Sequence, residues 1–152
     1  MPKIAIIYLS YHCEPYLDKA IEGWKKINHS KENIKIVVVD NTHPEHGSSG
    51  QFLKEKLLPI AGKEIPEVVI LPQEKNLGFA SGNNVGIKWA LENNFDYIFL
   101  HNQDGFVSSN CLSKLVETMK SNQKIGVIQP LILLYPKTDL VNTSGNKLHY
   151  LG

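Results

Sequence analysis

Short apolar runs alternate with amphipathic segments along this chain, and the alternation restricts the possible folds more than any other feature of the sequence. The runs are rich in Ile, Val and Leu and nearly continuous, which is typical of strands buried on both faces. They cover residues 3–10, 33–40, 67–72 and 96–102. Each run is followed by a segment that we expect to be helical, over 14–28, 51–61, about 80–93 and 108–122. Four strand–helix units in succession predict an α/β domain with a Rossmann-type, mostly parallel sheet, right-handed crossovers and helices on both faces.

The remaining elements and the totals refine this prediction. We expect a serine cap on the helix of 108–122 and one or two further strands within residues 125–134. A chain of 152 residues suits one domain, and its 16 basic and 15 acidic residues give a net charge of +1. This charge offers no electrostatic case for a nucleic-acid partner. No targeting segment or membrane-spanning stretch is visible, so the sequence predicts a soluble, cytoplasmic protein.

Polar residues stand where the predicted strands end, which is the edge at which parallel sheets bind ligands. Ser10 and Asp40 close the first two strands, and Asp104 follows the fourth. A strand-end aspartate can simply cap a turn through its side chain. Two such aspartates on one edge of the sheet favour a ligand site.

Of the two strand-end aspartates, Asp104 gives the more specific indication of a ligand site, because it lies in the segment "HNQDG" (101–105). Asn102, Gln103 and Asp104 form an oxygen-bearing cluster just past a strand. Mg²⁺ and Mn²⁺ prefer carboxylate, carbonyl and water ligands, and substrate phosphates often complete the shell. We therefore predict a metal–diphosphate site at Asp104; the alternative is a turn in which Asp104 and Gly105 reverse the chain. His101 could reach a phosphate, although a strand-end histidine is more often structural.

The stretch "NLGFASGNNVG" (76–86) contains three glycines and three asparagines and runs straight into an amphipathic segment. Glycine permits positive φ and close approach, and asparagine supplies an amide donor and acceptor. This composition predicts a shaped loop against a polar ligand at a helix N-terminus. The glycine spacing fits neither G-x-G-x-x-G nor a P-loop, which disfavours a dinucleotide-binding dehydrogenase and a P-loop enzyme.

Four stretches together resemble the family-2 glycosyltransferases, which have the GT-A fold, and especially their rhamnosyltransferase-like branch. They are "IAIIYLSYHCEPYLDKAIEGW", "IKIVVVDN", "NLGFASGNNVGIKWALENNFDYIFLHNQD" and "GVIQPLILL…NTSGNKLHYLG". The resemblance implies that Ser10 and Tyr11 line a nucleotide pocket and that Asp40 bonds the base. It also places a nucleotide-sugar-binding role on Asn76, Gly78, Asn83, Asn84, Asn102 and Gln103, the first four of them in the Gly/Asn loop. Asp104 matches the last acid of the family's DXD motif, which holds Mg²⁺ or Mn²⁺ on the donor diphosphate. Asn102 stands where many members have the first acid of that motif.

By this resemblance the activity is inverting transfer of a hexose or rhamnose from a dTDP- or UDP-linked donor to a hydroxyl of a glycan or lipid-linked acceptor, in cell-surface polysaccharide synthesis. Family members continue with an acceptor-side half that carries the general base. We therefore expect residues 1–152 to be the donor-binding part of a longer enzyme, inactive in transfer alone, with its catalytic base beyond residue 152. Peripheral membrane association and a homodimer are further expectations for the full enzyme. The alternatives are a nucleotide-sugar-binding module, a nucleotidyltransferase or a pure interaction domain; "SYHCEPYL" lacks the glycine and arginine that a nucleotidyltransferase usually shows after its first strand.

Overall fold

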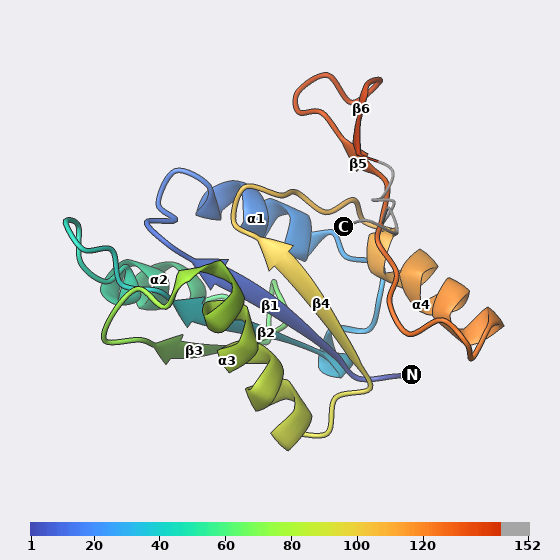
Figure 1. Ribbon diagram of the computed structural model, residues 1–152, viewed down its shortest axis with the longest axis horizontal. Helices are drawn as coiled ribbons and strands as arrows, with labels where there is room; N and C mark the ends of the chain where they lie inside the picture. The colour runs from blue at the N-terminus through green and yellow to red at the C-terminus, as the bar shows by residue number, and fades with distance from the viewer. Residues whose placement is uncertain (144–152) are drawn as a thin grey trace, which may run out of the picture. The chain divides into compact units, whose positions relative to one another are not determined.

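The computed structural model describes residues 1–143 (Figure 1). Contacts divide the chain into one compact unit that ends at Ser109 and a second that begins at Asn110. Each unit is described by itself below. The last part of the fourth resembling stretch, residues 144–152, lies outside the described residues.

The first unit contains the predicted α/β sheet. Its elements are β1 (Ile4–Ser10), α1 (Leu17–Lys25), the 3₁₀ helix η1 (Lys31–Asn33), β2 (Ile34–Asp40), α2 (Gly50–Leu57), β3 (Glu67–Pro72), α3 (Gly78–Glu92) and β4 (Tyr97–Asn102). The four strands are all parallel and lie in the order β3-β2-β1-β4. The predicted fold class is therefore confirmed, and each predicted strand agrees with the observed one to within one residue at each end.

Helices cover both faces of the sheet, with α3 on one face and α1 and α2 on the other (Figure 1). Side chains alternate between the faces along a strand. Ile7 and Leu9 of β1 belong to the core cluster beneath α3. Tyr8, between them, points to the other face, where its ring meets that of Trp24 of α1 edge-on with the centroids 5.0 Å apart. Both rings are fully buried, so β1 is packed from both sides.

Helix α3 begins at Gly78, about two residues before the predicted start. Gly82, Asn83, Asn84 and Gly86 lie in this helix, as the predicted range of about 80–93 has them, so the expectation of a ligand loop that extends to residue 86 is wrong. A Cβ atom on Gly82 would stand 2.6 Å from Leu9 Cδ1, and one on Gly86 would stand 2.5 Å from Ile7 Cγ2. Two of the three glycines thus allow α3 to approach β1 closely, which is a packing function.

The second unit contains α4 (Cys111–Ser121) and an antiparallel pair, β5 (Ile132–Leu133) and β6 (Val141–Thr143). The predicted serine cap is wrong, because Asn110 occupies the N-cap position and no side-chain cap hydrogen bond forms there. Within residues 125–134, only Ile132–Leu133 is a strand. Among residues 1–143 no helix has both the length and the apolar composition needed to cross a bilayer.

Candidate functional site

The topology of the first unit creates a crevice at the carboxyl ends of β1 and β4. The chain moves from β1 to β2 and β3 on one side, and returns through α3 to β4 on the other side of β1. Such a switch point separates the loops that follow β1 and β4 and is where open α/β sheets bind ligands. A cleft of about 400 Å³ lies there, lined by Leu9, Tyr11, Tyr16, Asn41, Asn76, Gly78, Phe79, Asn102, Gln103 and Asp104.

The cleft collects most of the predicted site residues, but not all of them. Tyr11, Asn76, Gly78, Asn102, Gln103 and Asp104 line it, whereas Ser10, Asp40, Asn83 and Asn84 do not. Asn83 is buried and donates a hydrogen bond to the carbonyl of Phe79 within α3 at 2.9 Å. Asn84 is exposed on the same helix. Neither borders the cleft in this structure.

Asp40 is fully buried and its carboxylate binds the loop that leads into α2. It accepts hydrogen bonds from the Ser48 hydroxyl and, at 3.3 Å, from the Ser49 N–H. Ser10, its register partner on β1, is also fully buried. The carboxylate of Asp40 therefore does what the turn-capping alternative expects, and its contact with a base stays a prediction.

Asn41 is a cleft residue that sequence reasoning missed, although it ends the quoted stretch "IKIVVVDN". It is 2% exposed. Its Oδ1 accepts from the Leu77 N–H at 3.1 Å, and its Nδ2 donates to Asn76 Oδ1 at 3.1 Å and to the Gly78 carbonyl at 3.2 Å. Gly78 has φ of +74°, a conformation that glycine adopts readily. Asn41 thus fixes the shape of the loop before α3, which forms one wall of the cleft.

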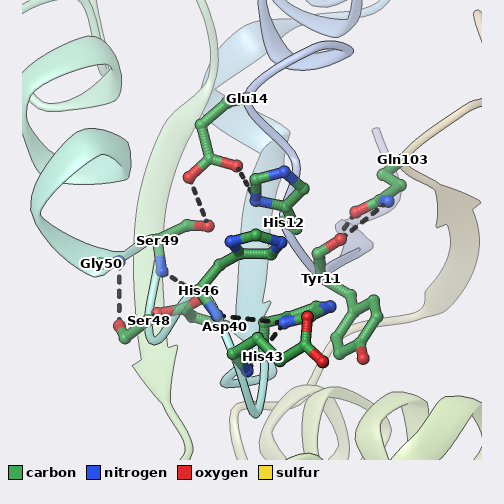
Figure 2. A network of polar contacts seen from close by, with 11 residues as sticks. Tyr11, His12, Glu14, Asp40, His43, His46, Ser48, Ser49, Gly50 and Gln103 are labelled. Atoms are coloured by element: carbon green, nitrogen blue, oxygen red, sulfur yellow. Dashed lines mark hydrogen bonds and ion pairs between the residues drawn. The ribbon is translucent and has the colours of Figure 1, made fainter.

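Gln103 joins the ends of β1 and β4. Its Oε1 accepts from the Tyr11 N–H at 2.8 Å, and its Nε2 donates to the Tyr11 carbonyl at 3.0 Å (Figure 2). The side-chain amide therefore continues the ladder between the two strands past their ends. It holds Tyr11 and the turn that carries Asp104 at a fixed separation.

His101 supports the same turn from below. It is 4% exposed, its Nδ1 accepts from the Trp24 Nε1–H at 3.2 Å, and its Nε2 lies 2.8 Å from the Gly105 carbonyl. Only a neutral ring with its hydrogen on Nε2 satisfies both contacts. Burial lowers the pKa of His101, with smaller opposing effects from the Gly105 carbonyl and Asp104. The structural interpretation of this histidine is confirmed, because both ring nitrogens are engaged within the protein.

Asp104 is exposed at the cleft and forms no salt bridge within residues 1–143. The turn that presents it is closed by a hydrogen bond from the Gly105 N–H to the Asn102 carbonyl at 3.0 Å. No group of three or more His, Cys, Asp or Glu side chains in the described residues could hold a metal ion. One free carboxylate beside the amide of Asn102 fits a divalent cation that takes its remaining oxygen ligands from phosphate and water.

The thiol of Cys13, which follows β1 in the sequence, is not a candidate nucleophile. Cys13 is fully buried beyond the end of β1. Burial raises the pKa of the Cys13 thiol to about 11, with a smaller opposing effect from Ser10. The thiol is therefore protonated at neutral pH, and a protonated thiol is a poor nucleophile.

Replacing Gln103 by leucine should destabilise the fold by about 1–3 kcal/mol, because the N–H and carbonyl of Tyr11 lose their partners in a part-buried place. The free energy of unfolding from urea titration measures the effect. Gln51→Leu is the matched control, since Gln51 is exposed on α2 and its side chain donates a hydrogen bond to its helix neighbour Glu55. Equal losses of unfolding free energy in the two variants would contradict the role of Gln103 in joining the ends of β1 and β4.

Comparison with known proteins adds family and fold. The sequence profile described as Glycosyl transferase family 2 matches residues 5–146. A search of curated proteins found no match. Among solved structures, S. aureus TarS 1–349 in complex with UDP-GlcNAc gives a TM-score of 0.64 at 17% identity, over 89% of this chain and 41% of that chain.

Two more TarS structures give the same result. TarS 1–349 in complex with UDP has a TM-score of 0.63 at 17% identity, over 89% of this chain and 43% of that chain. Another S. aureus TarS crystal structure has a TM-score of 0.63 at 18% identity, over 78% of this chain and 20% of that chain. This chain thus spans less than half of each TarS chain, and at these identities the likeness shows the GT-A-like α/β fold. Since the family profile extends over most of the sequence, the chain belongs to glycosyl transferase family 2.

Proposed function

We propose that the cleft binds a pyrimidine nucleoside diphosphate-sugar, UDP- or dTDP-linked, as the donor for inverting sugar transfer. The observation that carries the proposal is the pairing, in one cleft at the switch point, of the free carboxylate of Asp104 with the aromatic rings of Tyr11, Tyr16 and Phe79. The rings offer flat apolar surface to a base or a sugar, and the carboxylate offers a place for the diphosphate. Family membership supports a nucleotide-sugar substrate in general.

Within this proposal the cleft has a nucleoside side and a diphosphate side. Tyr11 and the loop fixed by Asn41 form the first, and Asn102 with Asp104 forms the second. A Mg²⁺ or Mn²⁺ ion held by Asp104 and the diphosphate would neutralise the charge that develops on the leaving nucleoside diphosphate. His101 and Gln103 keep the turn of Asp104 in place while the ligand binds.

The choice of a pyrimidine base has support from TarS, whose structures carry UDP-GlcNAc and UDP. Transfer of a hexose or rhamnose to a hydroxyl of a glycan or lipid-linked acceptor, in cell-surface polysaccharide synthesis, belongs to the same proposal. The residues of this cleft serve the donor side of that reaction.

Isothermal titration calorimetry with Mn²⁺ present tests the proposal. We expect UDP or dTDP to bind at least about tenfold more tightly than ADP or NAD, which corresponds to about 1.4 kcal/mol of binding free energy. Equal affinity for all four ligands, or a preference for the adenine nucleotides, would overturn the assignment of the donor.

A further inference from the structure

The loop between β2 and α2 is folded around one imidazole. His43 and Gly47 exchange two backbone hydrogen bonds of 2.9 Å, and inside this closed loop the Nδ1 of His43 accepts from the N–H of Glu45 at 3.1 Å and of His46 at 3.2 Å (Figure 2). An imidazole nitrogen can accept only while it carries no hydrogen. The loop as observed therefore requires a neutral His43 with its hydrogen on Nε2.

The imidazole of His43 also packs against Tyr11, which lines the cleft. The ring of Tyr11 packs on His43 with the centroids 4.7 Å apart. The ring of His43 also lies 4.5 Å from that of His46, which in turn stacks on His12 at 4.5 Å, and the centroids of His12 and His43 are 5.8 Å apart. The three imidazoles therefore form a compact cluster beside Tyr11, here called the ring cluster (Figure 2). Of the four rings, only Tyr11 lines the cleft. The contact between Tyr11 and His43 thus connects the cleft to the loop of residues 43–47.

We propose that the neutral imidazole of His43 is a positioning group for the nucleoside side of the cleft: it closes the loop of residues 43–47 and holds the ring of Tyr11, and its protonation releases both. A hydrogen on Nδ1 removes the acceptor that the Glu45 and His46 N–H groups share. A positively charged His43 ring would also have the imidazoles of His12 and His46 close by, with centroids 5.8 Å and 4.5 Å away. The part that concerns the nucleoside rests on the function proposed above.

Several charged and titratable groups surround the ring cluster. From the segment after β1, Glu14 contacts His12 at 3.1 Å and also accepts from the Ser49 hydroxyl at 2.8 Å. From β2, the carboxylate of Asp40 is buried and bonded to Ser48 and Ser49. Glu45 lies in the loop itself. Histidine ordinarily changes charge between about pH 5 and pH 8. Because His12 and His46 lie close to His43, only variants can assign a pH effect to His43 itself.

The loop can be followed without any ligand. In proton–nitrogen correlation spectra of the full chain, the Glu45 and His46 amides should show hydrogen-bonded shifts and protection at about pH 8, and lose both at about pH 5.5. His43→Asn keeps an acceptor oxygen at the position of Nδ1, as in an Asx turn, and does not titrate in this range. It should therefore keep both amides protected at both pH values. His43→Ala should leave them unprotected at both.

Nucleotide binding provides the second measurement. Affinity for UDP is measured by calorimetry without metal at the same two pH values. On acidification, the wild type should lose on the order of tenfold more affinity than His43→Asn, because apparent affinity falls with the population of protein whose loop is closed. Titration of the UDP phosphate itself is common to all variants and cancels in this ratio. His46→Gln is the matched control, because His46 bonds His43 through its backbone N–H. It should keep the pH step of the wild type.

The outcomes separate the two proposals. If His43→Asn keeps the wild-type pH step in the amide spectra, or if the wild-type amides do not change with pH, the role of His43 is overturned. If UDP fails to bind at any pH while the amides behave as expected, the proposed donor fails and the loop closure by His43 stands.

Discussion

Replacing Gly86 by valine should lower the free energy of unfolding by about 3 kcal/mol or more, because α3 could no longer reach the sheet. A Cβ atom at residue 86 would lie 2.5 Å from Ile7 Cγ2 and 3.2 Å from Val39 Cγ2. Both side chains are fully buried and belong to the core cluster beneath α3. Neither can move aside without disturbing its own strand, so the whole helix would have to shift outward.

Denaturant unfolding followed by circular dichroism measures this loss. Gly86→Ala should cost less, since the gain in helix propensity of about 1 kcal/mol offsets part of the overpacking. Gly126→Val is the matched control: a Cβ at residue 126 meets nothing within 4 Å and should change stability by no more than about 0.5 kcal/mol. A Gly86→Val protein as stable as the wild type would mean that α3 does not pack on β1 as described.

The glycines of residues 76–86 illustrate how much of the fold can be predicted from the sequence. The four strands could be located to within one residue, because runs buried on both faces are apolar without interruption. The start of α3 is predicted to about two residues, but the glycine and asparagine content of residues 76–86 predicts a ligand loop over a stretch that is mostly helix. Gly82 and Gly86 are instead four residues apart on one face of a helix, above Leu9 and Ile7. Which strand lies beneath a helix is a property of the tertiary fold, so composition alone could not distinguish packing from binding.

The cleft lies at the edge of the sheet where the sequence predicts a ligand site, but only some of the predicted side chains line it. Ser10 and Asp40 are paired in register and both fully buried, whereas the next residues, Tyr11 and Asn41, line the cleft. A step of one residue along an extended chain reverses the direction of the side chain. The sequence shows that polar residues gather at strand ends, but it does not show where each strand stops alternating. The same limit applies to Gln103, which lines the cleft yet uses its amide to hold Tyr11.

Asp104→Asn should remove most of the metal-dependent part of UDP binding, a loss of at least about tenfold in affinity with Mn²⁺ present. Asparagine keeps the shape and one oxygen of the side chain but removes its charge, and hard divalent cations depend on carboxylate oxygens. No cluster of three or more His, Cys, Asp or Glu side chains in residues 1–143 could replace it. Affinity for UDP without metal should change little, because the walls formed by Tyr11 and the loop fixed by Asn41 are intact.

The measurement is calorimetric titration of UDP with and without Mn²⁺, on the wild type, on Asp104→Asn and on Asp18→Asn. Asp18 is the matched control, since it is an exposed aspartate on α1 whose partner is Lys56 and it does not line the cleft. In the opposite direction, Asn102→Asp adds a second carboxylate to the same turn and should strengthen the Mn²⁺ effect, because two carboxylates bind a divalent cation better than one. An enhancement by Mn²⁺ that survives unchanged in Asp104→Asn would place the cation elsewhere and remove the "NQD" turn from the diphosphate site.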